Sequence, residues 1–220
     1  MKLHIGIAGA GIGGLAAAAL LADRGHAVTV FDQFEAPKPV GSGLVIQPVG
    51  LSVLDQIGVG DAARDLGARI ARMRGDEADS GRPVLDVRYD HAGTGRHGLG
   101  IHRSALFHVL INAVSARNIT LTAGTRISAR DGQDLLSEGG QRHGPFDLLV
   151  DAAGAASPLS PLDARPLPYG AIWGTVDWPD TNLPLDHLSQ RYRKADRMIG
   201  ALPVGRLPNE TAQKAAIFWS

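Results

Sequence analysis

Residues 3–32 read LHIGIAGAGIGGLAAAALLADRGHAVTVFD, and this stretch decides the fold. The apolar run over residues 3–8 predicts a buried parallel strand. The small-residue stretch over 12–24 predicts a helix that can lie close to a sheet, and Gly25 ends it. Residues 27–31 predict a second strand. A strand, a helix and a strand within about 30 residues form one right-handed crossover unit.

The turn between the first strand and the helix has the glycine spacing of a dinucleotide-binding loop. Gly9 is expected to make the tight turn, Gly11 to let the backbone approach a pyrophosphate, and Gly14 to let helix and strand meet. The start of the helix offers unpaired N–H groups to the phosphates. Asp32 is placed to accept hydrogen bonds from both ribose hydroxyls, and its charge disfavours a 2′-phosphate. The pattern predicts the ADP part of FAD or NAD.

Beyond Asp32 the chain no longer alternates simply between strand and helix. Weak alternation of apolar and polar residues over 69–90 predicts antiparallel strands, which form an inserted sheet. A strand over 99–102 leads into a helix that starts near Ser104. The other expected elements are a loop at 33–40, an apolar run at 44–46, a helix at 48–54, strands at 119–121, 125–129 and 133–137, a buried strand at 146–150, and strands at 169–178, 198–204 and 215–220.

Composition and charge limit the classes of function. The 22 basic and 22 acidic residues cancel, so no overall field attracts nucleic acid or an anionic membrane. The basic run 191–194 is expected to be a solvated turn, too short for a nucleic-acid surface. The lack of cysteine excludes a disulfide scaffold and a thiolate-bound metal. No membrane span is expected. We therefore expect a soluble, cytoplasmic protein.

Other residues that can carry chemistry are expected to be structural. His91 and His97 lie in a glycine-rich loop without a third ligand, so no metal site is expected. The serines lack the Gly-x-Ser-x-Gly pattern of hydrolases. Trp173, Trp178 and Trp219 are expected to lie in the core, with an aromatic-substrate pocket as the alternative.

Five segments carry a resemblance to a known family. Residues 9–15, 28–32, 41–48, 101–103 and 147–154 occur in the same order as the landmarks of that family. Together they resemble the FAD-dependent monooxygenases related to para-hydroxybenzoate hydroxylase, the aromatic hydroxylases. The resemblance covers essentially the whole chain and corresponds to the N-terminal portion of such proteins.

The resemblance implies an α/β fold with two parts. One is a Rossmann-like FAD-binding domain of the glutathione-reductase type, expected at residues 1–68 and 98–160. The other is an inserted, antiparallel β-sheet domain that binds the substrate, expected in truncated form at residues 69–97 and 161–220.

The resemblance also implies which residues contact the cofactor. Arg103 is expected to reach the ribityl-phosphate part of the flavin, while His102 is expected to be structural. Gln33 offers at most a neutral hydrogen bond where the family often has arginine. No side chain is expected to act as a catalytic group, because the flavin performs the oxygen chemistry. The expected FAD contacts are Gly9, Ala10, Gly11, Ile12, Gly13, Gly14, Asp32, Gln33, Gly43, Arg103, Ile127 and Gly154.

The chain departs from the family pattern in two places. The family usually has Gly-Ala-Asp-Gly where this chain has Asp151-Ala152-Ala153-Gly154, so Ala153 supplies no carboxylate to support FAD binding and NAD(P)H use. Relatives also continue well past this length and carry a second FAD contact, a Gly-Asp motif, that residues 155–220 lack. Either the chain is a fragment of a longer protein, or another chain covers its open sheet edge.

The activity implied by the resemblance is that of an FAD-dependent monooxygenase, an enzyme that hydroxylates an aromatic or other electron-rich small molecule. NADH or NADPH is the expected reductant. Two alternatives remain open: an NAD-dependent dehydrogenase or reductase that uses the same glycine turn, and a catalytically inactive or partner-dependent nucleotide-binding protein. Arg103 and the segment 41–48 favour FAD over NAD.

Overall fold

The computed structural model describes residues 1–36, 41–91, 93–162, 165 and 167–220, so part of the loop expected at 33–40 lies outside the described residues. The chain divides into two compact units. The parallel-sheet unit comprises Met1–Pro39 and Phe107–Pro166. The mixed-sheet unit comprises Val40–Leu106 and Leu167–Ser220.

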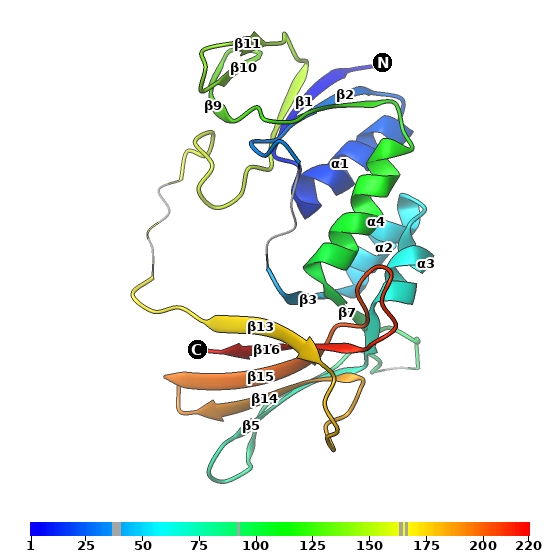
Figure 1. The fold of residues 1–220 in the computed structure, drawn as a ribbon, viewed down its shortest axis with the longest axis vertical. Coiled ribbons are helices and arrows are strands. Elements are labelled where there is room, and N and C mark those ends of the chain that lie inside the picture. Colours follow the sequence, from blue (N-terminus) through cyan, green and yellow to red (C-terminus); the bar gives the residue numbers. More distant parts are fainter. Residues whose placement is uncertain (37–40, 92, 163–164, 166) are drawn as a thin grey trace. The chain divides into compact units, whose positions relative to one another are not determined.

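The parallel-sheet unit is built on the predicted crossover unit. Its strands β12, β1, β2 and β8 lie in that order and all run parallel, with α1 along β1 and β2 (Figure 1). This confirms the Rossmann-like class of fold. The bounds are β1 His4–Ala8, α1 Ile12–Asp23, β2 Ala27–Phe31, β8 Ile119–Thr122 and β12 Leu148–Asp151.

The two faces of the parallel sheet bury different side chains, because successive residues of a strand point to opposite faces. Ile5 and Ile7 of β1 are fully buried on one face, in register with Val28 and Val30 of β2. On the other face lies Gly6, where a Cβ atom would come within 2.7 Å of the Phe146 ring. The glycine lets an aromatic ring lie directly on the strand.

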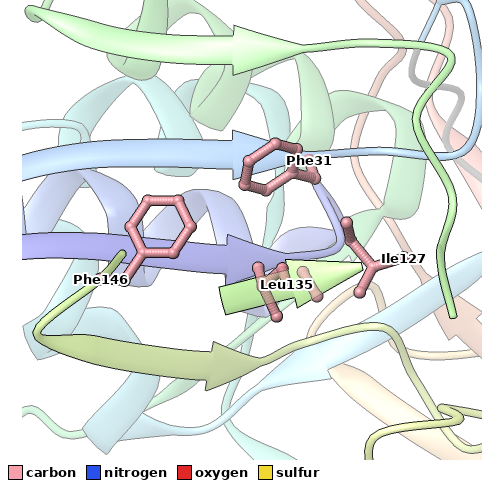
Figure 2. Close-up of a cluster of buried hydrophobic side chains, with 5 residues drawn as sticks. Phe31, Ile127, Leu135 and Phe146 are labelled. Atoms are coloured by element: carbon pink, nitrogen blue, oxygen red, sulfur yellow. The ribbon is translucent and has the colours of Figure 1, made fainter. Parts of the chain in front are cut away.

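A small antiparallel sheet packs around that ring. Its strands are β9 Ile127–Asp131, β10 Asp134–Ser137 and β11 Arg142–His143, and β9 and β10, the strands expected near 125–129 and 133–137, form an antiparallel hairpin. Figure 2 shows the side chains of Phe31, Ile127, Leu135 and Phe146 gathered in one cluster, all buried. The cluster fixes the hairpin against the end of β2, one residue before Asp32.

The mixed-sheet unit contains a larger sheet in the order β13-β16-β15-β14-β5-β6, in which only the β14–β5 pair is parallel (Figure 1). The antiparallel pair β5–β6 confirms the strands expected within 69–90. The bounds are β5 Arg72–Glu77, β6 Pro83–Arg88, β13 Ile172–Asp177, β14 His187–Arg193, β15 Arg197–Pro203 and β16 Lys214–Trp219.

A second sheet of this unit has the order β3-β7-β4 and is antiparallel. Ile70, Leu202, Val204 and Ala216 form a buried cluster of side chains from β4, β15, β16 and the segment after β15. The other elements of this unit are β3 Gly43–Ile46, α2 Pro48–Gln56, α3 Gly60–Leu66, β4 Ala68–Ile70 and β7 Gly98–His102. The helix α4 Arg103–Ser115 begins in this unit, and its residues from Phe107 onward belong to the parallel-sheet unit.

Two local expectations need correction, and one helix was missed. Residues 191–193 are not a solvated turn but the end of β14, and the turn starts at Lys194. The strand expected over 146–150 begins at Leu148 and lies at an edge of the parallel sheet, so Leu148 is exposed rather than buried. The short helix α3 was not expected from the sequence.

The division into units differs from the expected domain boundaries. Residues 40–68 and 98–106 belong to the same compact unit as the mixed sheet, whereas the resemblance groups them with the cofactor domain. Which residues form the FAD-binding and substrate-binding domains therefore stays a prediction.

Candidate functional site

The glycine turn after β1 is held tightly by backbone contacts. The Gly9 N–H donates a hydrogen bond to the Phe31 carbonyl at 2.7 Å. Its φ of +103° favours glycine, and a Cβ atom there would overlap the Ala152 carbonyl. A Cβ atom on Gly14 would overlap the Gly9 carbonyl. The first and third glycines of the motif are therefore required by the turn and by the contact between helix and strand.

Gly11 and Gly13 are in a different position, because a Cβ atom on either would meet nothing within 4 Å. Gly11 is the N-cap of α1 with φ −72° and ψ −178°, a backbone conformation that any residue adopts. No side chain caps the helix, and its first turn holds no acidic residue. The start of α1 therefore has open space beside Gly11 and Gly13 and no capping side chain, an arrangement that attracts an anion.

Asp32 lies beside this turn and is buried, with 9% of its surface exposed. Its Oδ2 accepts a hydrogen bond from the Ala10 N–H at 2.8 Å, and its Oδ1 accepts one from the Phe34 N–H at 3.0 Å. A carboxylate has about four acceptor positions, so each oxygen keeps one for a further donor. The acid thus stabilises the glycine turn and retains the capacity to bind a diol.

The segment after β12 forms a turn that is held by hydrogen bonds between its own residues. Asp151 Oδ1 accepts hydrogen bonds from the Ala153 N–H at 3.1 Å and the Ser157 hydroxyl at 2.7 Å. Gly154 follows with a φ of +89° and an exposed backbone. An open pocket of about 640 Å³ lies against this turn and is lined in part by Gly13, Asp151 and Gly154. Asp151 Oδ1 therefore stabilises the turn that carries Ala153 and Gly154.

Two expected cofactor contacts lie in contrasting surroundings. The Ile127 side chain is 6% exposed and belongs to the hydrophobic cluster around Phe146 (Figure 2). Gln33 is exposed directly after Asp32. Ile127 thus has a structural role that the sequence did not assign to it, while the Gln33 side chain is accessible.

In the mixed-sheet unit, Gly41 and Arg103 lie against each other. The Arg103 N–H donates to the Ser42 carbonyl at 2.7 Å. A Cβ atom on Gly41 would overlap Arg103 Cδ and come within 3.3 Å of the Trp173 ring. The structure gives the exposed Arg103 guanidinium no ion-pair partner among the described residues. Gly43 is explained by packing, because a Cβ atom there would overlap Val204.

A network of hydrogen-bonded polar side chains lies beside Arg103. His102 Nδ1 lies 2.6 Å from the Ser104 hydroxyl, and Nε2 lies 3.1 Å from the Thr175 hydroxyl. The Thr175 hydroxyl is 2.8 Å from that of Ser42, which donates to the Gly174 carbonyl at 3.1 Å. Burial holds the pKa of His102 below its usual range. The sequence indicated a structural His102 but gave no signal for Ser42 or Thr175.

The expectation that the tryptophans lie in the core is wrong for two of them. Trp173 is 50% exposed and Trp219 is 58% exposed, while Trp178 is half-buried. Within the described segments, no group of three or more His, Asp or Glu side chains is arranged to hold a metal ion. Of the helices that the structure describes, none is long and apolar enough to cross a membrane.

Comparison with known proteins gives a consistent set of similarities. Residues 2–139 match the family model described as "FAD binding domain". The FAD-dependent monooxygenase atnJ of Arthrinium sp is 30% identical over 77% of this chain and 41% of its own length. The 3-amino-4-hydroxybenzoate 2-monooxygenase of Streptomyces cremeus is 31% identical over 70% of this chain and 40% of its own length.

The fold is also found in solved structures. The tetrameric form of 2-methyl-3-hydroxypyridine-5-carboxylic acid oxygenase aligns over 100% of this chain and 59% of its own, with a TM-score of 0.76 and 18% identity. This chain therefore spans well under two thirds of the proteins that it matches.

Proposed function

Because the chain belongs to the family of FAD binding domains, we propose that it binds FAD with the ADP part at the Gly9–Gly14 turn and Asp32. The observation that carries this proposal is the open space in front of Gly11, at an uncapped helix start, next to a buried carboxylate with acceptor capacity left. A turn that only connected β1 to α1 would have no need of a glycine at position 11.

Each group at this turn has a proposed role. The N–H groups of Ile12 and Gly13 point toward the pyrophosphate and stabilise its charge through hydrogen bonds and the dipole of α1. Ala10 keeps its N–H on Asp32, which orients the carboxylate toward the ribose hydroxyls. Gln33, exposed one residue later, donates a neutral hydrogen bond to the same nucleoside.

The remaining contacts follow the family resemblance. Arg103 is proposed to bind the ribityl-phosphate part of FAD, and its lack of an ion-pair partner among the described residues supports this role. Gly43 and Gly154 are proposed to contact the cofactor through their backbones. For Ile127 the buried side chain leaves only its backbone for such a contact.

For the whole protein we propose a flavin-dependent monooxygenase that hydroxylates an aromatic or other electron-rich small molecule. Bound FAD supplies the redox chemistry with O₂. The chain's own residues hold the cofactor, and none of those described is assigned to proton transfer. The exposed ring of Trp173, next to Gly41 and Arg103, offers an aromatic surface for such a substrate.

The test of this proposal is an absorbance spectrum of the purified protein, or of the protein with added FAD. We expect bound oxidised flavin, which loses its absorbance when NADH or NADPH is added without oxygen. Flavin that stays oxidised would contradict the use of NADH or NADPH as its reductant. Binding of NAD in place of FAD would support the dehydrogenase alternative and overturn the proposal.

We further expect Arg103→Ala to weaken FAD binding by about 10- to 150-fold, because a charge-assisted hydrogen bond to phosphate contributes about 1.5–3 kcal/mol. Titration of the cofactor-free protein with FAD measures this change. Arg96→Ala removes an exposed arginine of the same unit and serves as the matched control. Equal dissociation constants for the two variants would place the flavin phosphate away from Arg103.

A further inference from the structure

The side chains of His102, Thr175 and Ser42 beside Arg103 are linked by consecutive hydrogen bonds. The donor and the acceptor of each bond can be assigned by starting from the two ends of this network. At one end the backbone N–H of Ser104 donates to His102 Nδ1 at 3.1 Å, so Nδ1 carries no proton and accepts from the Ser104 hydroxyl at 2.6 Å as well. At the other end the Ser42 hydroxyl donates its only proton to the Gly174 carbonyl. Ser42 Oγ must therefore accept from Thr175, and Thr175 Oγ1 must accept from His102 Nε2.

Both ends lead to the same state of His102, which is neutral with its proton on Nε2. An imidazolium would place a second N–H against the N–H of Ser104 and lose that hydrogen bond. The charged groups facing His102 from the packed elements are Glu210, which favours the imidazolium, and Lys214, which opposes it. Lys214 is itself paired with Glu210 at 2.7 Å and with Asp177 at 2.6 Å.

This hydrogen-bond network joins three segments that are far apart in the sequence. His102 and Ser104 flank Arg103 at the start of α4, Ser42 lies between Gly41 and β3, and Thr175 lies in β13. Trp173 is two residues before Thr175. The hydrogen bonds therefore connect the segment that bears Arg103 with the strand that bears the exposed tryptophan.

We propose that neutral His102 is a positioning residue, which ties β13 to the segments around Arg103 through the hydroxyls of Thr175 and Ser42. This role rests on the proposed binding of FAD by Arg103, because the tie holds Arg103 and Trp173 in a fixed arrangement. A histidine that only filled space would not need a particular protonation state. The positioning role of His102 requires a hydroxyl at position 175 and a neutral imidazole.

Nuclear magnetic resonance of the cofactor-free protein tests the assignment directly. Of the eight histidines, His102 is identified by the signals lost in His102→Gln. We expect Nε2 to be protonated and Nδ1 to be bare in the wild type, and we expect the Nε2–H signal to shift in Thr175→Val, which removes the acceptor of that N–H. A proton on Nδ1, or the same spectrum in Thr175→Val, would overturn the proposal.

Stability against pH gives a second readout. Because the folded state disfavours the imidazolium, the unfolded chain binds more protons, so this part of the stability is complete above about pH 6.5 and is lost as the pH falls. His102→Gln should remove this slope below about pH 6.5, while His91→Gln, in an exposed loop, should keep it. Equal slopes in His102→Gln and the wild type would contradict the proposal.

FAD titration completes the test. Thr175→Val keeps the branched shape but removes the hydroxyl, and should weaken FAD binding about tenfold. Thr175→Ser restores the hydroxyl and should bind within about threefold of the wild type. Equal loss in both variants would overturn the positioning role. If the wild type binds no FAD, the proposed function fails, while the tautomer and the pH slope still decide the state of His102.

Discussion

Gly11→Val is expected to abolish FAD binding and leave the protein folded. The Cβ atom of residue 11 points into open space, and its backbone conformation is allowed for valine, so the folded chain gains no clash. The added side chain occupies the space through which the pyrophosphate must approach the start of α1. Flavin absorbance should be absent after purification. The melting temperature of the cofactor-free protein should change by less than about 2–4 °C, which corresponds to about 1 kcal/mol in a chain of this length.

Gly14→Ala is the matched control within the same motif. Its Cβ atom would overlap the Gly9 carbonyl, so the helix and the strand must move apart. We expect a loss of stability of about 1–3 kcal/mol in the cofactor-free protein, measured by urea unfolding. If Gly11→Val retains FAD with an unchanged dissociation constant, the pyrophosphate binds elsewhere. If both variants lose the same stability, the open space in front of Gly11 is not available.

Asp32→Ala is expected to weaken both cofactor binding and the fold. Removal of the carboxylate leaves the Ala10 and Phe34 N–H groups without their acceptor, and the ribose hydroxyls lose theirs as well. Each unsatisfied buried group costs about 1–3 kcal/mol. We therefore expect an FAD dissociation constant about 5- to 150-fold higher, together with a lower free energy of unfolding in the cofactor-free protein.

These two effects can be separated by measurement. Titration calorimetry with FAD gives the affinity, and urea unfolding without FAD gives the stability. Asp61→Ala removes a fully exposed carboxylate of the mixed-sheet unit and should change neither quantity. A loss of stability with an unchanged affinity would mean that Asp32 only supports the glycine turn, and the ribose site would then lie elsewhere.

The crossover unit could be predicted because its signals are local and agree with one another. The glycine spacing, the apolar strands and the acid after β2 lie within residues 3–32, and the structure brings Gly9, Gly14 and Asp32 into contact with the same turn. One hydrogen bond of this turn could not be predicted from the sequence. Asp32 accepts from Ala10, and this bond depends on how the backbone N–H of the turn is directed.

The side-chain contacts of the mixed-sheet unit could not be predicted from the spacing of residues in the sequence. Ser42 and Thr175 are separated by 133 residues, and nothing in either local sequence indicates the other. Strand β14 was missed because its sequence HLSQRYR is mostly polar. It forms because β15 and β5 satisfy its backbone on both sides, which overrides the weak local preference.

The parallel pair β14–β5 also has a consequence for the synthesis of the chain. Residues 72–77 pair with 187–192, so β5 and β6 leave the ribosome long before β14 is made. At about 5–20 residues per second, the open edge of β5 waits roughly 5–20 s for its partner. Arg72, Arg74, Asp76 and Glu77 place charges of both signs along that strand. Such charges disfavour pairing of the open edge with another nascent chain, before Arg72, Arg74 and Asp76 form their ion pairs in the folded state.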